Sequence, residues 1–149
     1  MTVLFRPVAQ SDWPAIGRVA DQALPHAAEG NRQWLEARRS LDELRRRRRQ
    51  YVVQEDGEIV GYGAIEEDDE GRWRLFVVMS TERLNGAPGN HTFARLLLEA
   101  RAAGAEALWM REEASDTAMA RFARRHEFVE TQRYRAGALP VVVYERPLV

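Results

Sequence analysis

The sequence contains neither cysteine nor lysine. Without cysteine the chain can form no disulfide, thiolate metal site or iron–sulfur cluster, and it cannot use a cysteine nucleophile. Without lysine it can form no Schiff base and lacks the lysine of a Walker-type phosphate loop, so nucleotide hydrolysis of that kind is excluded. All 22 basic residues are therefore arginine, and the 23 acidic residues reduce the net charge to −1, which gives no global attraction to nucleic acid or anionic lipid.

Long apolar runs are also missing. No stretch approaches 18 consecutive apolar residues, and charged residues interrupt the first twenty positions. We therefore predict neither a membrane span nor a secretory signal, and we expect the cytoplasm.

His26, His91 and His126 are widely spaced, so we expect no metal site. The chain has 149 residues, of which 45% are hydrophobic and 30% charged, and this composition predicts one globular domain over residues 1–149.

The alternation of apolar and polar residues predicts an α+β domain with the element order βααβββαβαββ. Asp56-Gly57 between two β-rich runs predicts a hairpin, and the run 72–79 extends it to an antiparallel meander. Ser11 is the predicted cap of the first helix. The other predicted features are a strand over 3–8, helices over about 31–48, 88–103 and 116–126, a loop over 80–90, a strand over 107–111 and a terminal hairpin turning at Gly137.

Two charge runs allow alternative interpretations. Arg45 to Arg49 could bind phosphate or nucleic acid, but five like charges near a helix C-terminus usually form a solvated face. Glu66 to Glu70 could attract a cationic amine, or could only keep a hairpin tip soluble. We favour the solvated interpretation of the basic run, and therefore expect no nucleic-acid partner.

The element order and several ordered motifs resemble the GNAT superfamily of acyl-CoA-dependent N-acetyltransferases. The stretch FVVMSTERLNG, residues 76–86, is similar to the family's fourth strand, Val-x-Pro step and R/Q-x-x-G-x-G/A loop. Residues 108–128, LWMREEASDTAMARFARRHEF, match the spacing of its fifth strand, Asn-x-x-Ala helix start and terminal Gly-Phe. The resemblance spans the chain and implies a mixed, mostly antiparallel sheet flanked by helices.

The resemblance also implies a site for acetyl-CoA as co-substrate. The loop before the helix at 88 presents unpaired backbone N–H groups and the positive end of a helix dipole, which suit a diphosphate. Pro88 stands where the family has a final Gly or Ala, so this loop has one donor fewer. The backbone of the fourth strand would run beside the pantetheine arm. The residues expected to bind the coenzyme are Val77, Val78, Met79, Arg83, Leu84, Gly86, Ala87, Pro88, Gly89 and Asp116.

Acylation of an amine requires a base for its proton and often an acid for the departing thiolate. Ala123 occupies the position where the family often has a tyrosine acid, so that role is vacant. Tyr134 on the next strand is the nearest candidate to replace it, although a strand tyrosine can also be purely structural. Glu112 or Glu113, at the end of the fifth strand, could serve as the base.

Two functions follow from this pattern. The first is direct transfer of an acetyl group from acetyl-CoA to the primary amine of a small molecule or peptide, by a protein that could also form a homodimer. The second is a GNAT-like domain that binds acyl-CoA, or another ligand, without catalysis. The vacant tyrosine position and the altered loop favour the second function, whereas direct transfer agrees with the absence of cysteine.

Overall fold

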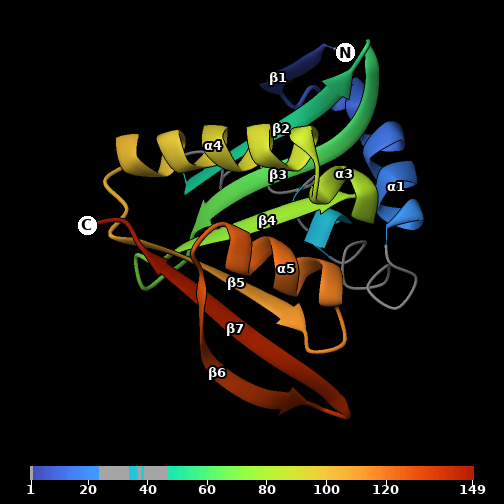
Figure 1. Cartoon of the computed structure of the whole chain (residues 1–149). Helices are drawn as coiled ribbons and strands as arrows, with labels where there is room; N and C mark the ends of the chain where they lie inside the picture. The colour runs from blue at the N-terminus through green and yellow to red at the C-terminus, as the bar shows by residue number, and fades with distance from the viewer. Residues whose placement is uncertain (1, 24–33, 37, 39–46) are drawn as a thin grey trace.

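The computed structural model describes residues 2–23, 34–36, 38 and 47–149. Seven strands form one sheet, and helices cover both of its faces (Figure 1). The strands are β1 (Val3–Pro7), β2 (Arg48–Glu55), β3 (Glu58–Glu67), β4 (Trp73–Met79), β5 (Ala107–Glu113), β6 (Val129–Ala136) and β7 (Leu139–Pro147). The helices are α1 (Trp13–Gln22), α3 (Thr81–Leu84), α4 (Ala87–Ala102) and α5 (Thr117–Arg125), with a 3-10 turn at Gln10–Asp12 and helical residues at 34–36 and 38.

The strand order is β1-β2-β3-β4-β5-β7-β6. All neighbouring strands are antiparallel except β4 and β5, which are parallel. The hairpin at Asp56-Gly57 is confirmed, since both residues have positive φ, as the tight turn requires. Gly137 likewise turns β6 into β7 with positive φ. The predicted α+β class, with a mixed and mostly antiparallel sheet, is confirmed.

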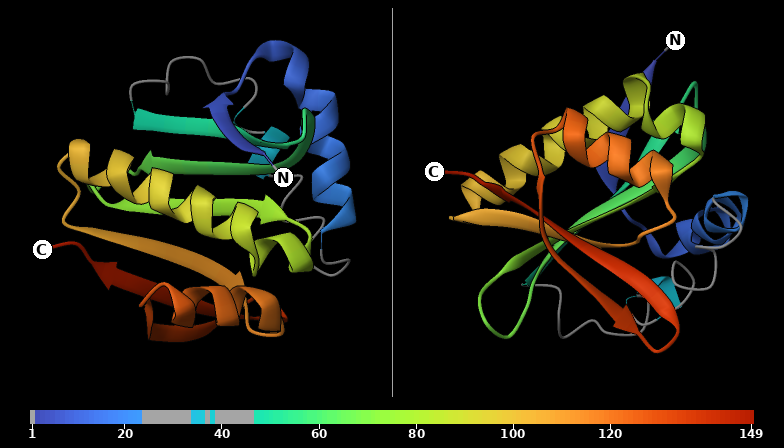
Figure 2. Two further views of the ribbon diagram at one scale, coloured as in Figure 1. Left: turned by 45° about the horizontal axis from the view of Figure 1, so that its top comes forward. Right: turned by 60° about the horizontal axis from the view of Figure 1, so that its bottom comes forward.

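The two faces of the sheet carry different helices. In Figure 2, α4 and α5 lie on one side, and α1 with the helical residues 34–36 and 38 lies on the other. Phe93 of α4 and Phe122 of α5 contact each other over the first face, with ring centroids 6.0 Å apart. On the second face the ring of Trp34 stacks on Phe76 at 4.2 Å. Because β4 alternates between these two cores, it is buried over most of its length.

The structure corrects three details of the sequence prediction. The loop expected over 80–90 contains the short helix α3, which Ser80 caps by accepting a hydrogen bond from the backbone N–H of Arg83 at 3.4 Å. The helix expected to reach residue 48 gives way to strand β2 at Arg48, and its remaining part over 31–46 falls mostly outside the described residues. Asp12 rather than Ser11 precedes α1, and its carboxylate is bound by Arg6 at 2.7 and 2.8 Å.

The basic run is not a solvated face where the structure describes it. Arg48 is buried, with Nε 3.4 Å from the Glu66 carboxylate, and Arg47 pairs with Asp69 at 2.9 Å. The two charge runs of the sequence thus meet each other across β2, β3 and the turn that follows, because β2 and β3 pair from Arg48↔Glu66 onward. Arg45 and Arg46 lie outside the described residues.

Candidate active site

The site begins where β4 and β5 separate. These parallel strands pair only at Trp73↔Leu108 and Arg74↔Trp109. Beyond those pairs, Val77 to Met79 keep their ladder to β3 but have left β5. The backbone of this half-strand is therefore open on one side, as an extended ligand pairing with a strand edge requires.

A small pocket of about 30 Å³ lies at the separated strand ends. It has room for one or two water molecules and is too small to hold a coenzyme. Six of its residues were predicted from the sequence: Val77, Val78, Met79, Leu84, Glu112 and Asp116. The others are Ala23, Thr81, Ala118 and Met119.

Glu112 is the acidic side chain of this pocket with the altered pKa. Burial, together with the nearby carboxylates of Asp116 and Glu113, raises its pKa to about 8 against the opposing effect of Arg74. A carboxyl group with this pKa exchanges protons near neutral pH, as a general base for an amine requires. The sequence suggested Glu112 as a base only from its position at the end of the fifth strand. Its surroundings in the fold give it the pKa that a base for an amine requires.

Asp116 has a structural explanation of its own. It is buried and caps α5, accepting a hydrogen bond from the backbone N–H of Met119 at 3.1 Å. This is the ordinary role of aspartate before a helix. Ala123 lies fully buried on the same helix, so no side chain from that position reaches the pocket with a donor group.

The loop before α4 provides the predicted helix start. The first helical hydrogen bond of α4 runs from Asn90 N–H to Gly86 O, which leaves the N–H groups of Ala87 and Gly89 at the open end of the helix. Pro88 between them has no N–H. Gly86 and the exposed Ala87 lie at the surface, whereas Leu84, Pro88 and Gly89 are buried.

Arg83 is paired with a carboxylate of another element. Its Nε lies 3.6 Å from the carboxylate of Glu55 at the end of β2. The predicted phosphate ligand is thus paired with a carboxylate, and it would have to exchange that partner to bind a diphosphate.

Arg125 is a residue of the loop that sequence reasoning missed. From the last turn of α5 it donates to the backbone oxygen of Leu84 at 2.8 Å and to that of Asn85 at 3.0 Å. These contacts hold the end of α3 against α5, beside a surface hollow lined by Thr81, Glu82, Asn85, Arg121 and Arg125. The sequence carried no signal for this pairing, because Arg125 is one of several arginines in a basic helix end.

Tyr134 does not join Glu112. Tyr134 pairs with Val141, which pairs with Glu113, so these three lie in one row across β6, β7 and β5. Successive strand residues face opposite sides, and Tyr134 therefore lies on the face opposite to that of Glu112. Its ring is half-exposed and has the guanidinium of Arg111 5.6 Å from its centroid. The structure does not bring this tyrosine to the pocket.

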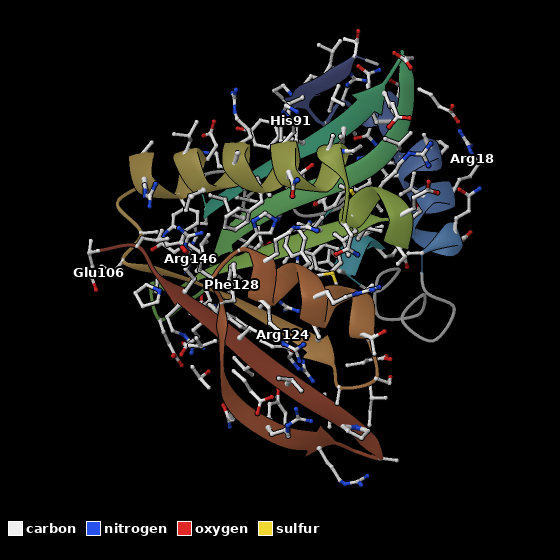
Figure 3. All side chains as sticks on the ribbon, viewed as in Figure 1. Arg18, His91, Glu106, Arg124, Phe128 and Arg146 are labelled. Carbon is white, nitrogen blue, oxygen red and sulfur yellow. The ribbon has the colours of Figure 1, made fainter. Side chains whose placement is uncertain are left out.

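Arg146 and His126 close the opposite end of the α4–α5 interface. Figure 3 shows Arg146 reaching from β7 toward the space between the two helices, where it donates to the backbone oxygen of His126 at 3.0 Å. The ring of His126 stacks on Phe93 at 4.2 Å. Burial lowers the pKa of His126 to about 4, with the charges of Arg125 and Arg146 acting in the same direction, so this histidine is neutral at pH 7.

Over the residues that the structure describes, no helix is long and apolar enough to cross a membrane. Within that same part of the chain, no three His, Cys, Asp or Glu side chains are grouped as a metal site would require.

No protein-family model and no curated protein matches this sequence. Solved structures do match its fold over nearly the whole chain. A GNAT-family structure from Desulfovibrio desulfuricans has a TM-score of 0.80 at 18% identity and covers 99% of this chain and 100% of its own. The ribosomal-protein-S18-alanine N-acetyltransferase from Escherichia coli has a TM-score of 0.75 at 15% identity, covering 99% and 94%.

A third structure, from Salmonella typhimurium, was determined with acetyl-CoA; its TM-score is 0.73 at 19% identity, and the match covers 100% of this chain and 95% of that one. At these identities the likeness concerns the fold. The separated β4 and β5, the loop that begins α4 and the α5 helix all occur within the matched length, and this chain therefore has the fold of the GNAT-superfamily acetyltransferases.

Proposed function

We propose that this protein is an acyl-CoA-dependent N-acetyltransferase that transfers an acetyl group to the primary amine of an acceptor. The observation that carries the proposal is Glu112, a carboxyl group whose pKa of about 8 is set by burial in the pocket between the separated strands. Few purely structural reasons place an ionisable group there, and catalytic sites commonly contain such altered groups.

The residues fit acetyl-CoA in two respects. The open backbone of Val77 to Met79 suits the amides of a pantetheine arm, and the N–H groups of Ala87 and Gly89 suit a diphosphate. Bound acetyl-CoA would supply an acetyl group activated as a thioester.

Glu112 would accept a proton from the acceptor ammonium, which leaves the amine nitrogen with the free electron pair that it needs for attack. Its pKa of about 8 places this exchange near neutral pH. Tyr134, on the opposite face, is not part of this proposal, and the thiolate-protonating role at Ala123 is left to solvent.

The test is calorimetry with CoA and acetyl-CoA, followed by acetyl transfer to a set of primary amines. Transfer releases the CoA thiol, and a thiol reagent reads it without background because the protein contains no cysteine. No heat at millimolar CoA would contradict the proposal.

A second function is favoured by specific contacts in the loop. Arg83 is paired with Glu55 and Pro88 lacks an N–H, so the coenzyme could be bound weakly by a domain without catalysis. Calorimetric binding of acetyl-CoA without thiol release for any amine would favour this second function.

A further inference from the structure

Arg74 lies on the sheet face opposite α4 and α5, at the point where β4 and β5 last pair. Its neighbour across the pairing is Trp109. The guanidinium carbon of Arg74 lies 4.7 Å from the centroid of Trp34 and 5.1 Å from that of Trp109, so it packs against two indole rings. Aromatic rings of this kind attract the charge but accept no strong hydrogen bond.

Two buried donors at this position lack acceptors. Among the described residues, neither Arg74 Nε nor Trp109 Nε1 has a hydrogen-bond partner. Buried polar groups are nearly always paired, and an unpaired donor costs the free energy of its lost hydration. A water molecule or a ligand oxygen at this position would satisfy both donors.

The nearest carboxylate on this face is already bound. Glu66 accepts hydrogen bonds from Arg38 at 2.9 and 3.0 Å, and Arg48 Nε lies 3.4 Å from it. Burial lowers the pKa of Arg74; the charges of Glu112 and Glu66 oppose this shift, and those of Arg38 and Arg111 add to it.

Arg72 packs against the same ring, that of Trp109, but its guanidinium is paired with carboxylates. It also lies 5.1 Å from the centroid of Trp109, but its Nε is 3.2 Å from the carboxylate of Asp68 and 3.5 Å from that of Glu70. An arginine that packs against this indole can therefore still pair with a carboxylate. Arg74 differs from Arg72 because it lacks such a pairing.

We propose that Arg74, with Trp109 Nε1, binds a carboxylate of the acceptor, so that the amine substrate is a zwitterion or an acidic peptide. This proposal rests on the proposed function. Val78, at the pocket, lies on the same face as Arg74 and four residues along β4, a separation of about 13 Å in a strand. Glu112 lies on the opposite face of the sheet from Arg74, so the acceptor must pass between the separated ends of β4 and β5 to bring its amine to Glu112, and its amine and carboxylate are separated by up to the length of about four extended residues.

The probes are glycine and its peptides of two, three and four residues, each compared with its C-terminal carboxamide. At the best length we expect kcat/KM for the carboxylate to exceed that for the carboxamide at least tenfold, as loss of a charge-assisted hydrogen bond predicts. Arg74→Met should remove this preference, measured within the variant as the ratio of kcat/KM for the carboxylate to kcat/KM for the carboxamide of the same length. Arg74→Lys, which retains the charge without the planar fork, should retain part of the preference.

Arg72→Met is the matched control, because it removes an arginine from the same indole and should leave the preference intact. Melting temperatures identify any variant that fails to fold. Equal rates and equal calorimetric affinities for carboxylate and carboxamide at every length, with acetyl-CoA bound, would overturn the inference while leaving the proposed function standing. If acetyl-CoA does not bind, calorimetric binding of the carboxylate probes that Arg74→Met abolishes would still support the anion site, and its absence would overturn it.

Discussion

Two partly buried titratable side chains of the protein have pKa values that loss of hydration moves in opposite directions. Glu112 is an acid with its pKa raised to about 8, and His126 is a base with its pKa lowered to about 4. In both cases the fold favours the neutral form. Each therefore makes stability depend on pH, in different pH ranges and with opposite signs.

Replacing Glu112 with glutamine should remove a loss of stability at alkaline pH. The pKa of Glu112 in the folded protein is about 8, against 4.5 in the unfolded chain, so its contribution is full below pH 4.5 and is lost as pH rises through 8. At pH 9 we expect the variant to be more stable than the wild type by at least about 1 kcal/mol, measured by denaturant unfolding.

The same variant should lose activity, because the amide cannot accept the amine proton. We expect kcat/KM to fall about 100-fold or more, together with the alkaline rise of the pH–rate profile near 8. Glu106→Gln is the control, since Glu106 lies exposed at the start of β5 (Figure 3). A variant as active as the wild type would show that Glu112 is not the base.

Replacing His126 with phenylalanine should protect the protein in acid. The folded pKa of about 4 lies below the unfolded value of 6.5, so the stability that neutral His126 contributes is present above pH 6.5 and is lost as pH falls toward 4. Phenylalanine retains the stacking on Phe93 and does not titrate. We compare the free energy of unfolding of the variant with that of the wild type at pH 5 and at pH 7.5. The difference in favour of the variant should be about 1 kcal/mol larger at pH 5 than at pH 7.5.

His91→Phe is the matched control for this pair of unfolding curves. His91 is exposed on the outer side of α4 (Figure 3). The same acid protection from this control would mean that burial of His126 is not the cause.

Close backbone packing and a charged side chain together hold the elements around the coenzyme loop. Gly89 begins α4 directly against the carbonyl group of Leu84 at the end of α3, and a Cβ at Gly89 would overlap that oxygen. Arg125 then ties the same carbonyl to α5. Gly89, which the sequence suggested as a coenzyme residue, thus also has a packing role that fixes the loop.

Gly89→Ala should destabilise the protein and weaken CoA binding together. The added methyl group forces α3 and α4 apart, at a cost of about 2–3 kcal/mol in unfolding free energy. Gly17→Ala is the matched control, because a Cβ at Gly17 in α1 meets nothing within 4 Å. That helical substitution should stabilise the protein by about 0.5–1 kcal/mol and leave CoA affinity unchanged. Equal stabilities for the two variants would contradict the close contact.

Over the whole molecule, local sequence signals predicted the strands, the two turns with positive φ and the α4 and α5 helices, because each depends on residues near in sequence. Contacts between distant segments were not predictable in this way. Three such contacts form only when the sheet is complete. Arg83 pairs with Glu55, and Arg125 donates hydrogen bonds to the end of α3. Arg74 packs between Trp34 and Trp109. Coenzyme contacts, the homodimer and the cytoplasmic location stay predictions.

The two halves of the sheet meet at a short seam, and this predicts how the whole protein responds to coenzyme. Strands β1 to β4 and strands β5 to β7 are joined in the sheet through only the pairs Trp73↔Leu108 and Arg74↔Trp109. A ligand lying along the open edge of β4 would contact both halves. By mass action, acetyl-CoA at 100 times its dissociation constant should add about 2.7 kcal/mol to the unfolding free energy.

Hydrogen exchange would locate this effect along the chain. We expect acetyl-CoA to slow amide exchange beyond the global change at Val77 to Met79, Ala87 and Gly89, where backbone N–H groups face the proposed site. The turn from β3 to β4 at Gly71 lies at the other end of β4 from Val77 to Met79 and is the internal control. Protection that is uniform over β1 to β7 would mean that the ligand stabilises the fold from another surface, and the separated strands would not be its site.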